Sequence, residues 1–306
     1  STSGDTTVTV GSISGDGTLG LIPDGPDIQD PAGNGLGGGE PSTNEVYEID
    51  QTLPTVTSIT RSSPTDASTS SSSVTFSVSF SEPLATVDAS DFTLGSTPGG
   101  TATIDGVSTS GDTTVTVSSI SGEGVLGLDV SGSGTTQDPA GNGLGTPEPS
   151  TDETYTIDNT GPAVTEITRS SPTGESTNQS SVSFGVSFSE RVESLGTGDF
   201  ALSGTLGGAT IDGVDTSGDT TIAVSGISGD GTLGLDVSSG SAQDLAGNAL
   251  DTAEPPTDQT YTIDNTAPAV TAITRSSPTA SPTNNASVTF AVSFSESLDQ
   301  VDAADF

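Results

Sequence analysis

The sequence contains no cysteine, methionine, tryptophan or histidine, and it contains no lysine. Without cysteine there are no disulfides and no thiolate ligands, and without histidine a zinc ion lacks its usual nitrogen ligand. The same absences exclude Ser-His and Cys-His nucleophilic catalysis. The absence of lysine also excludes a Lys–Asn isopeptide cross-link. The chain must therefore be held together by packing, or by a hard cation bound through oxygen.

Basic residues are almost missing: four arginines stand against 41 aspartates and glutamates, for a formal net charge of -37. This balance argues against nucleic acid as a partner, because phosphate binding needs basic side chains. It indicates either a halophilic source, where salt screens the repulsion, or acidity that serves solubility. We favour the halophilic interpretation, because a complete lack of lysine exceeds what solubility requires. No apolar run approaches the ~18 residues of a membrane span, and the ends are expected to be cuts through a longer protein.

Three sequence landmarks recur at one period. The string SGDTTVTV begins at Ser3 and Ser110, and its variant SGDTTIAV begins at Ser217, a spacing of 107 residues both times. The string TRSSPT and the dipeptide Asp-Phe return at almost the same spacing, with the landmark residues Arg61, Arg169, Arg275, Phe92, Phe200 and Phe306. Independent markers with one period predict a tandem array of one structural unit.

The joints between units are predicted at three similar segments that end in proline, residues 49–54, 157–162 and 263–268. Because proline cannot donate a hydrogen bond within a sheet, each segment is expected to end one unit and start the next. The resulting parts are residues 1–52, the C-terminal half of a domain; residues 53–159 and 160–266, two complete domains; and residues 267–306, the N-terminal portion of a domain.

Valine and phenylalanine alternate with serine and threonine at residues 74–80, as in a strand with one buried face. A disordered chain has no reason to keep such alternation, although 29% hydrophobic residues and high charge are typical of disorder. The pattern predicts an all-β fold of tandem immunoglobulin-like, seven-strand sandwiches of about 107 residues each. In the first complete domain the expected strands are 56–59, 74–80, 92–94, 102–104, 115–117, 126–130 and 155–157.

The motifs ITRSSPT, VTFSVSFSE, DASDF, QDPAGN and YTIDNT together resemble the bacterial immunoglobulin-like repeats of large repetitive cell-surface proteins and adhesins. The resemblance covers the whole chain. It implies extracellular display, rod-like arrays and, in some members of the family, calcium at the domain junctions. It implies no particular ligand.

Acidic side chains and asparagines are predicted to gather at one pole of each domain, where alternate loops and the preceding joint meet. Around the first complete domain they are Asp50, Glu82, Asp88, Asp91, Asp138 and Asn142. At the next junction they are Asp158, Glu190, Asp199, Asp244 and Asn248. Groups of oxygen ligands alone suit calcium. The alternative is that these residues form turns through hydrogen bonds from backbone to side chain, and the sequence leaves both interpretations open.

Catalysis is not expected. A carboxylate pair could in principle serve glycoside hydrolysis, but the same carboxylates recur in every unit, which points to architecture. The glycine-rich run at residues 35–39 is followed by no lysine and by no predicted helix, so it does not predict a phosphate-binding loop.

The sequence therefore favours a structural function, as an extracellular, cell-surface repeat array that forms a stalk or fibre of an adhesin or filament. The alternative is a module whose loops at one pole bind a glycan or a protein, although three tyrosines and no tryptophan leave few platforms for sugar stacking. The expected partners are neighbouring repeats of the same protein.

The two end segments cannot each bury a full two-sheet core. They are expected to be completed by covalent continuation of the array, or by a neighbouring copy that adds strands to the open edge. We prefer covalent continuation, because strand exchange needs an additional evolved fit. In either case Val8 and Val10 are expected to pack on Val288 and Phe290.

Overall fold

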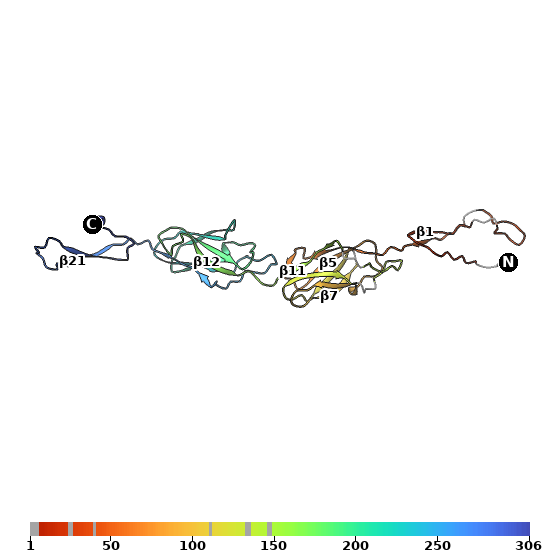
Figure 1. Ribbon diagram of the computed structural model, residues 1–306, viewed down its shortest axis with the longest axis horizontal. Helices are drawn as coiled ribbons and strands as arrows, with labels where there is room; N and C mark the ends of the chain where they lie inside the picture. The colour runs from red at the N-terminus through yellow and green to blue at the C-terminus, as the bar shows by residue number, and fades with distance from the viewer. Residues whose placement is uncertain (1–5, 24–26, 39–40, 110–111, 132–135, 146–148) are drawn as a thin grey trace. The chain divides into compact units, whose positions relative to one another are not determined.

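The computed structural model describes residues 6–23, 27–38, 41–109, 112–131, 136–145 and 149–306 (Figure 1). Regular structure in these residues is nearly all β, and their helical segments are the 3₁₀ turns η1 (Ala89–Asp91), η2 (Thr197–Asp199) and η3 (Ala303–Asp305). Among the described residues no helix has the length and apolar character needed to cross a membrane. The contacts divide the chain into two compact units, Ser1–Thr160 and Gly161–Phe306.

The first unit contains a complete sandwich of two sheets. A five-stranded sheet has the order β10-β3-β5-β8-β7, and a four-stranded sheet has the order β4-β11-β9-β6. Figure 1 labels β5, β7 and β11 in this sandwich. The strands are β3 (Val56–Ser63), β4 (Ser68–Thr69), β5 (Val74–Phe80), β6 (Phe92–Ser96), β7 (Thr103–Ser108), β8 (Thr113–Ser118), β9 (Gly124–Val130), β10 (Thr151–Asp152) and β11 (Tyr155–Ile157).

The second unit contains a sandwich with the same topology. Its sheets have the orders β16-β17-β14-β12-β19 and β13-β20-β18-β15. The strands are β12 (Val164–Ser171), β13 (Ser176–Thr177), β14 (Val182–Phe188), β15 (Phe200–Gly204), β16 (Thr210–Asp215), β17 (Thr221–Ser225), β18 (Gly231–Val237), β19 (Thr257–Asp258) and β20 (Tyr261–Ile263).

The sheet order is that of a constant-type immunoglobulin domain. Strands β3, β5, β8 and β7 take the places of A, B, E and D, and β6, β9 and β11 take those of C, F and G. The bounds of β5 and β11 are those predicted from the sequence. The count of seven strands is wrong, because β4 and β10 are also present as short parallel strands beside β11 and β3. A two-residue strand shows no alternation and so leaves no sequence signal.

The core forms where the alternating residues of β5 and β14 meet the opposite sheet. Phe76 and Phe184 are fully buried, and each ring lies edge-on to a buried tyrosine, with centroids 5.1 Å and 5.2 Å apart. Burying one such side chain stabilises the fold by about 1.5–3 kcal/mol. The buried face predicted for residues 74–80 is wrong in degree at Phe80, which is half-buried because the last residue of the strand lies at the edge of the core. The equivalent Phe188 is half-buried as well.

Tyr155 joins the two sheets of the first sandwich. Its hydroxyl lies 2.7 Å and 2.9 Å from the carbonyl oxygens of Pro64 and Thr75 and shares its one proton between them. Nearby, the Arg61 guanidinium donates to the Thr154 carbonyl at 2.9 Å and pairs with the Glu153 carboxylate at 3.3 Å. These bonds fix the last strand of the sandwich against its first strand.

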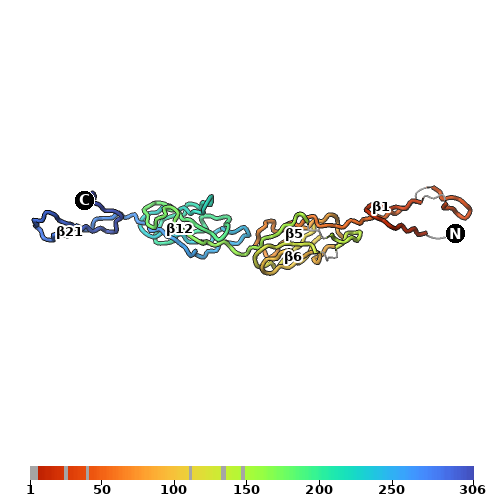
Figure 2. Tube along the Cα trace, in the orientation of Figure 1, coloured from red at the N-terminus to blue at the C-terminus, as the bar shows by residue number. Residues whose placement is uncertain are grey.

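The two ends of the chain form separate two-stranded sheets. Near the N-terminus β1 (Gly17–Leu19) pairs with β2 (Tyr47–Ile49), and near the C-terminus β21 (Val270–Ser277) pairs with β22 (Thr289–Phe294). Figure 2 traces the β21 end, whose sheet in the described residues consists of β21 and β22. Large apolar side chains on both ends are accordingly exposed.

Candidate cation site

Three carboxylates converge at one pole of the first sandwich. Asp50 follows β2, Glu82 follows β5, and Asp138 lies in the loop between β9 and β10. One carboxylate oxygen of each lies within 4.8 Å of the other two. Asp138 is buried, while Asp50 and Glu82 are half-buried. The structure thus brings together the joint and two loops that the sequence predicted to meet.

Asn142 connects the Asp138 loop to the joint. The two oxygens of the Asp138 carboxylate accept from the backbone N–H of Asn142 at 2.9 Å and from its side-chain amide at 2.8 Å. The same amide donates to the Asp50 carbonyl at 3.0 Å. The turn interpretation therefore holds for Asp138 and Asn142. It leaves cation binding open, since an ionised carboxylate has about four lone-pair sites and these bonds use two.

The electrostatics of the three carboxylates differ. Burial raises the pKa of Glu82, and the charges of Asp50, Asp138 and Asp16 raise it further. Burial also works against ionisation of Asp138, but the hydrogen bonds from Asn142 outweigh it, so the pKa of Asp138 lies below its usual value. Ionisation is therefore favoured at Asp138 and disfavoured at Glu82. A bound cation would reduce the electrostatic repulsion between the two carboxylates.

The group opens to solvent through a depression of about 320 Å³. Its lining residues are Glu48, Asp50, Glu82, Pro83, Pro139 and Ala140. Carboxylate oxygens dominate its polar atoms, so the depression suits a hard divalent cation better than an anion or an apolar ligand.

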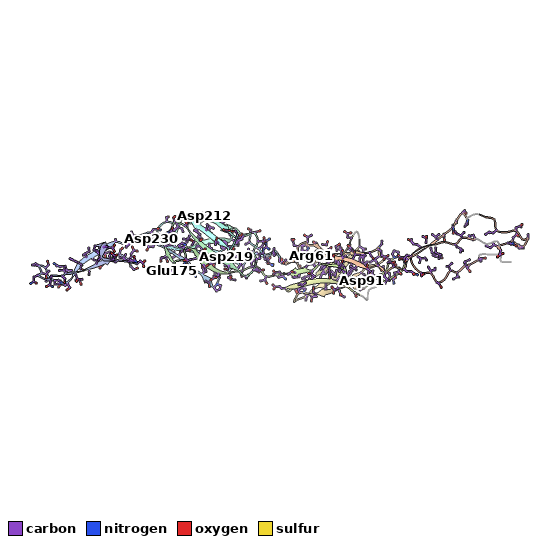
Figure 3. All side chains as sticks on the ribbon, turned by 45° about the horizontal axis from the view of Figure 1, so that its top comes forward. Arg61, Asp91, Glu175, Asp212, Asp219 and Asp230 are labelled. Atoms are coloured by element: carbon purple, nitrogen blue, oxygen red, sulfur yellow. The ribbon has the colours of Figure 1, made fainter. Side chains whose placement is uncertain are left out.

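Asp88 and Asp91 do not join this group. The Asp91 carboxylate accepts from the backbone N–H of Asp88 at 2.7 Å and of Thr136 at 3.2 Å, and Asp91 is fully buried. The Asp88 carboxylate accepts from the Ser90 N–H at 2.7 Å, which caps η1. Figure 3 labels Asp91 within the first sandwich. Both residues fix the turn before β6, and Asp91 also ties it to the loop after β9.

The residues predicted for the second junction fall in both units: Asp158 belongs to the first, and the others belong to the second. In the second unit the Asp244 carboxylate accepts from the backbone and side-chain amides of Asn248, both at 2.8 Å, as Asp138 does from Asn142. Asp199 repeats the role of Asp91: its carboxylate accepts from Gly196 N–H at 2.7 Å and from Ala242 N–H at 2.9 Å.

Glu190 lies two residues after the end of β14 and is half-buried. Asp158 belongs to the first unit, where its carboxylate accepts from the Thr160 N–H at 3.1 Å.

A further acidic group, which the sequence does not predict, lies in the second unit. Carboxylate oxygens of Asp236, Glu254 and Asp258 approach within 4.8 Å of one another. Burial raises the pKa of Asp258, and the charge of Asp236 raises it further. Burial also raises the pKa of Glu254, whose carboxylate accepts a hydrogen bond from the Val237 N–H at 3.0 Å. The sequence signal for this group is weak: Asp236 lies in β18 and Asp258 lies in β19. The two-residue strand β19 is too short to be predicted, so the proximity of the two aspartates is not predicted either.

No family model matches the chain, and no curated protein matches it. Among solved structures it is similar to FdeC, an adhesin of Escherichia coli, with a TM-score of 0.37, 12% identity and coverage of 71% of this chain and 67% of that one. It is similar to invasin, a bacterial integrin-binding protein, with a TM-score of 0.32, 11% identity and coverage of 76% and 45%. The adhesin InvE of Yersinia pseudotuberculosis gives a TM-score of 0.24, 15% identity and coverage of 69% and 58%.

Proposed function

We propose that this chain is a structural segment of an extracellular, cell-surface repeat array, a stalk or fibre that separates a binding element from the cell. The observation that supports it is the repetition of one sandwich, with the same sheet order, in both units. The core positions repeat as well, down to the edge-on pairs Phe76–Tyr155 and Phe184–Tyr261. A spacer needs uniform units, whereas a binding site needs one unit that differs.

The pairing of the first strand with the last strand but one suits a load-bearing segment. β10, near the end of the first sandwich, pairs in parallel with β3, its first strand, through Thr151 opposite Ser58 and Asp152 opposite Ile59. In the second sandwich β19 pairs with β12 in the same way. Pulling the two ends of a sandwich apart slides such parallel strands along each other, so their hydrogen bonds are loaded together instead of one by one.

The stalk role can be tested by display on a cell that carries a dense surface polysaccharide. The chain is placed between a surface anchor and an epitope, and antibody binding to the epitope is measured. We expect high binding with the whole chain and a progressive loss when residues 161–266 and then residues 53–266 are deleted. Equal binding to the epitope on the anchor alone would contradict the spacer role.

We further propose that calcium binds at Asp50, Glu82 and Asp138 and stiffens the joint before the first sandwich. The mutual approach of their oxygens and the depression beside them support this site. Additional oxygens from water complete the 6–8 ligands that calcium takes. The same residue types stand at Asp158, Glu190 and Asp244, and a second cation there remains a prediction from the sequence.

Calorimetric titration of the whole chain with calcium chloride tests this site. We expect binding that Glu82→Gln weakens at least about tenfold, since one charged ligand is lost from a small set. The matched control is Glu166→Gln, which removes the same charge from an exposed position on β12. Identical titrations for the parent chain and Glu82→Gln would show that this group binds no calcium.

A further inference from the structure

The two complete sandwiches differ at one sheet edge. In the second sandwich β15 pairs with β18 over five consecutive residues without a register shift, from Phe200 to Gly204. In the first sandwich the equivalent pairing of β6 with β9 is interrupted between Leu94 and Ser96. Gly95 has no residue opposite it, so β6 carries a bulge where β15 is regular.

The sequence shows that Gly95 is an extra residue of the first sandwich. The string SGDTT returns after 107 residues, whereas the Asp-Phe landmark returns after 108, so the first sandwich has one more residue between these landmarks. Gly95 is that residue, because Ser96 and Ser203 both lie opposite the same glycine of the repeat. Only glycine fits there, since a Cβ would collide with the Asp129 carboxylate.

The bulge matters because an edge strand presents unpaired N–H and C=O groups, which proteins usually protect by bulges, charges or very short strands. In the second sandwich the edge strands β13 and β19 have two residues each. The edge strand β16 has a register shift and carries Asp212 and Asp215. β15, with the sequence FALSG, has no charge, no proline and no register shift. It is therefore the one unprotected edge strand of this sandwich.

The alternation of ladder bonds identifies the unpaired groups of β15. Ser238 N–H donates to the Asp199 carbonyl at 2.8 Å. Because such bonds recur at every second residue of an antiparallel pair, Ala201 and Ser203 bond to β18. The N–H and C=O of Leu202 point to the open edge instead. An added strand would gain two main-chain hydrogen bonds at Leu202.

The outer face beside this edge is acidic. Asp236 lies opposite Ala201, on the solvent side of β18 between two buried residues. Its carboxylate belongs to the acidic group with Glu254 and Asp258. Burial raises the pKa of both of these residues, and the charge of Asp236 raises it further. The ion pairs found in the described residues lie elsewhere, so this negative charge has no cationic partner among them.

The spacing of strands defines which side chains an added strand should carry. Its residue opposite Ala201 would lie about 10 Å from Asp236, two strand spacings away. Ala201 is small and exposed, so an extended lysine or arginine side chain passes over it toward the carboxylate. The next residue of the added strand points to the other face, beside the half-buried Leu202, where an apolar side chain fits.

We infer that β15 docks an extended segment of a partner protein in which basic and apolar residues alternate, and that this segment joins the four-stranded sheet as its fifth strand. Main-chain bonds supply affinity in this mode of binding, and alternate side chains supply specificity. A second copy of the chain does not fit, because the net charge is -37 and none of the four arginines stands in an alternating segment. The second sandwich is thus a docking unit as well as a spacer.

Fluorescence anisotropy with the whole chain and a labelled synthetic peptide tests this inference. The probe is the peptide TKVRVKT, in about 0.15 M sodium chloride to limit long-range attraction. We expect saturable binding of one peptide per chain. The peptide KRKTVVT has the same composition without the alternation and should bind at least about tenfold more weakly. No binding of the first peptide, or equal binding of both, would overturn the inference.

A glycine insertion tests the edge itself. One glycine placed between Leu202 and Ser203 gives β15 the residue order of β6 and should weaken peptide binding at least about tenfold. The melting temperature should stay close to that of the parent chain, since the first sandwich contains the same glycine. The matched control is one glycine inserted after Gly207, in the loop between β15 and β16, which should bind like the parent. Binding unaffected by the insertion in β15 would overturn the inference.

A charge substitution tests the acidic face. Asp236→Asn should weaken binding of the alternating peptide about threefold or more, since an ion pair at the surface is lost. Asp212→Asn removes the same charge from an exposed position on β16 and should leave binding unchanged. Equal effects of the two substitutions would contradict the pairing with Asp236.

Sedimentation of the chain alone distinguishes the other occupant of this edge. We expect a mass of 30.0 kDa at every concentration. Self-association that the glycine insertion in β15 abolishes would assign the edge to a second copy and overturn the inference.

Discussion

At the scale of single residues, aspartates of the same repeat have different surroundings. Asp91 is buried, and each of its carboxylate oxygens accepts a hydrogen bond from a backbone N–H. Asp50 is half-buried and lies in the joint before the first sandwich. The sequence predicts that Asp50, Glu82 and Asp138 meet, because strand alternation fixes which loops share a pole. It does not separate Asp91 from them, because burial depends on how the loop after β9 folds over η1.

Glu82 should make stability depend on pH when no cation is bound. Its pKa is raised by burial and by neighbouring charge, so the folded state binds its proton more tightly than the unfolded state does. Stability should therefore rise as pH falls through the raised pKa to the ordinary value of 4.5. In chelator, we expect Glu82→Gln to unfold at a higher temperature than the parent near pH 7, with the difference vanishing near about pH 4. If the unfolding temperatures of Glu82→Gln and the parent differed by the same amount at every pH, Glu82 would not be the source of the pH dependence. The same conclusion would follow if the control Glu166→Gln showed the same pH dependence as Glu82→Gln.

The buried tyrosine hydroxyl should contribute measurably to stability. Tyr155→Phe removes the donor to Pro64 and Thr75 and leaves two carbonyls without it, which should lower the free energy of unfolding by about 1–3 kcal/mol. Denaturant titration of dilute protein measures this change. Tyr47→Phe is the matched control, because Tyr47 is exposed in the single chain and its loss of a hydroxyl should be neutral there.

At the scale of elements, the long strands follow from the sequence and the short ones do not. β5 shows seven residues of strict alternation, and its bounds are predicted correctly. β4 and β10 have two residues each and form because the neighbouring strands β11 and β3 offer open edges. Their existence depends on tertiary contacts, which a local pattern does not encode.

The short strand β10 should matter to the stability of the first sandwich. Glu153 N–H, which directly follows β10, donates to the Ile59 carbonyl at 3.0 Å. Glu153→Pro removes this donor and should lower the free energy of unfolding of this sandwich by about 1–3 kcal/mol. Glu153→Gln should change it by less than about 1 kcal/mol, since glutamine stands at the equivalent position 259 and accepts from Arg169 N–H. If denaturant unfolding showed equal effects of the two substitutions, the pairing of β10 would contribute nothing measurable to the stability of this sandwich.

At the scale of the whole molecule, the charge of -37 should make stability depend on salt. Screening shortens the range of repulsion from about 10 Å at 0.1 M to about 3 Å at 1 M salt. We expect the melting temperature to rise steadily over this range, and to rise similarly in sodium chloride and sodium bromide because screening depends on ionic strength. A melting temperature that is flat in both salts would contradict a halophilic origin.

Most of the fold can be predicted because the unit repeats. The spacing of the Asp-Phe and TRSSPT landmarks aligns each incomplete end with a complete sandwich, so the roles of Tyr47 and Phe290 follow from those of Tyr155 and Phe184. The acidic group at Asp236, Glu254 and Asp258 cannot be predicted in this way, because Asp236 and Asp258 lie on strands of different sheets, β18 and β19, and Glu254 lies outside both strands.

The load-bearing role is tested most directly by pulling single molecules of the whole chain from their two ends. The account predicts two unfolding steps of equal length, one for each sandwich, each about 35 nm at roughly 3.5 Å per residue for about 100 residues. Both steps should need similar forces, because in each sandwich the first strand pairs in parallel with the last strand but one. Extension without two resolved and equal steps would contradict a stalk built from uniform, mechanically resistant units.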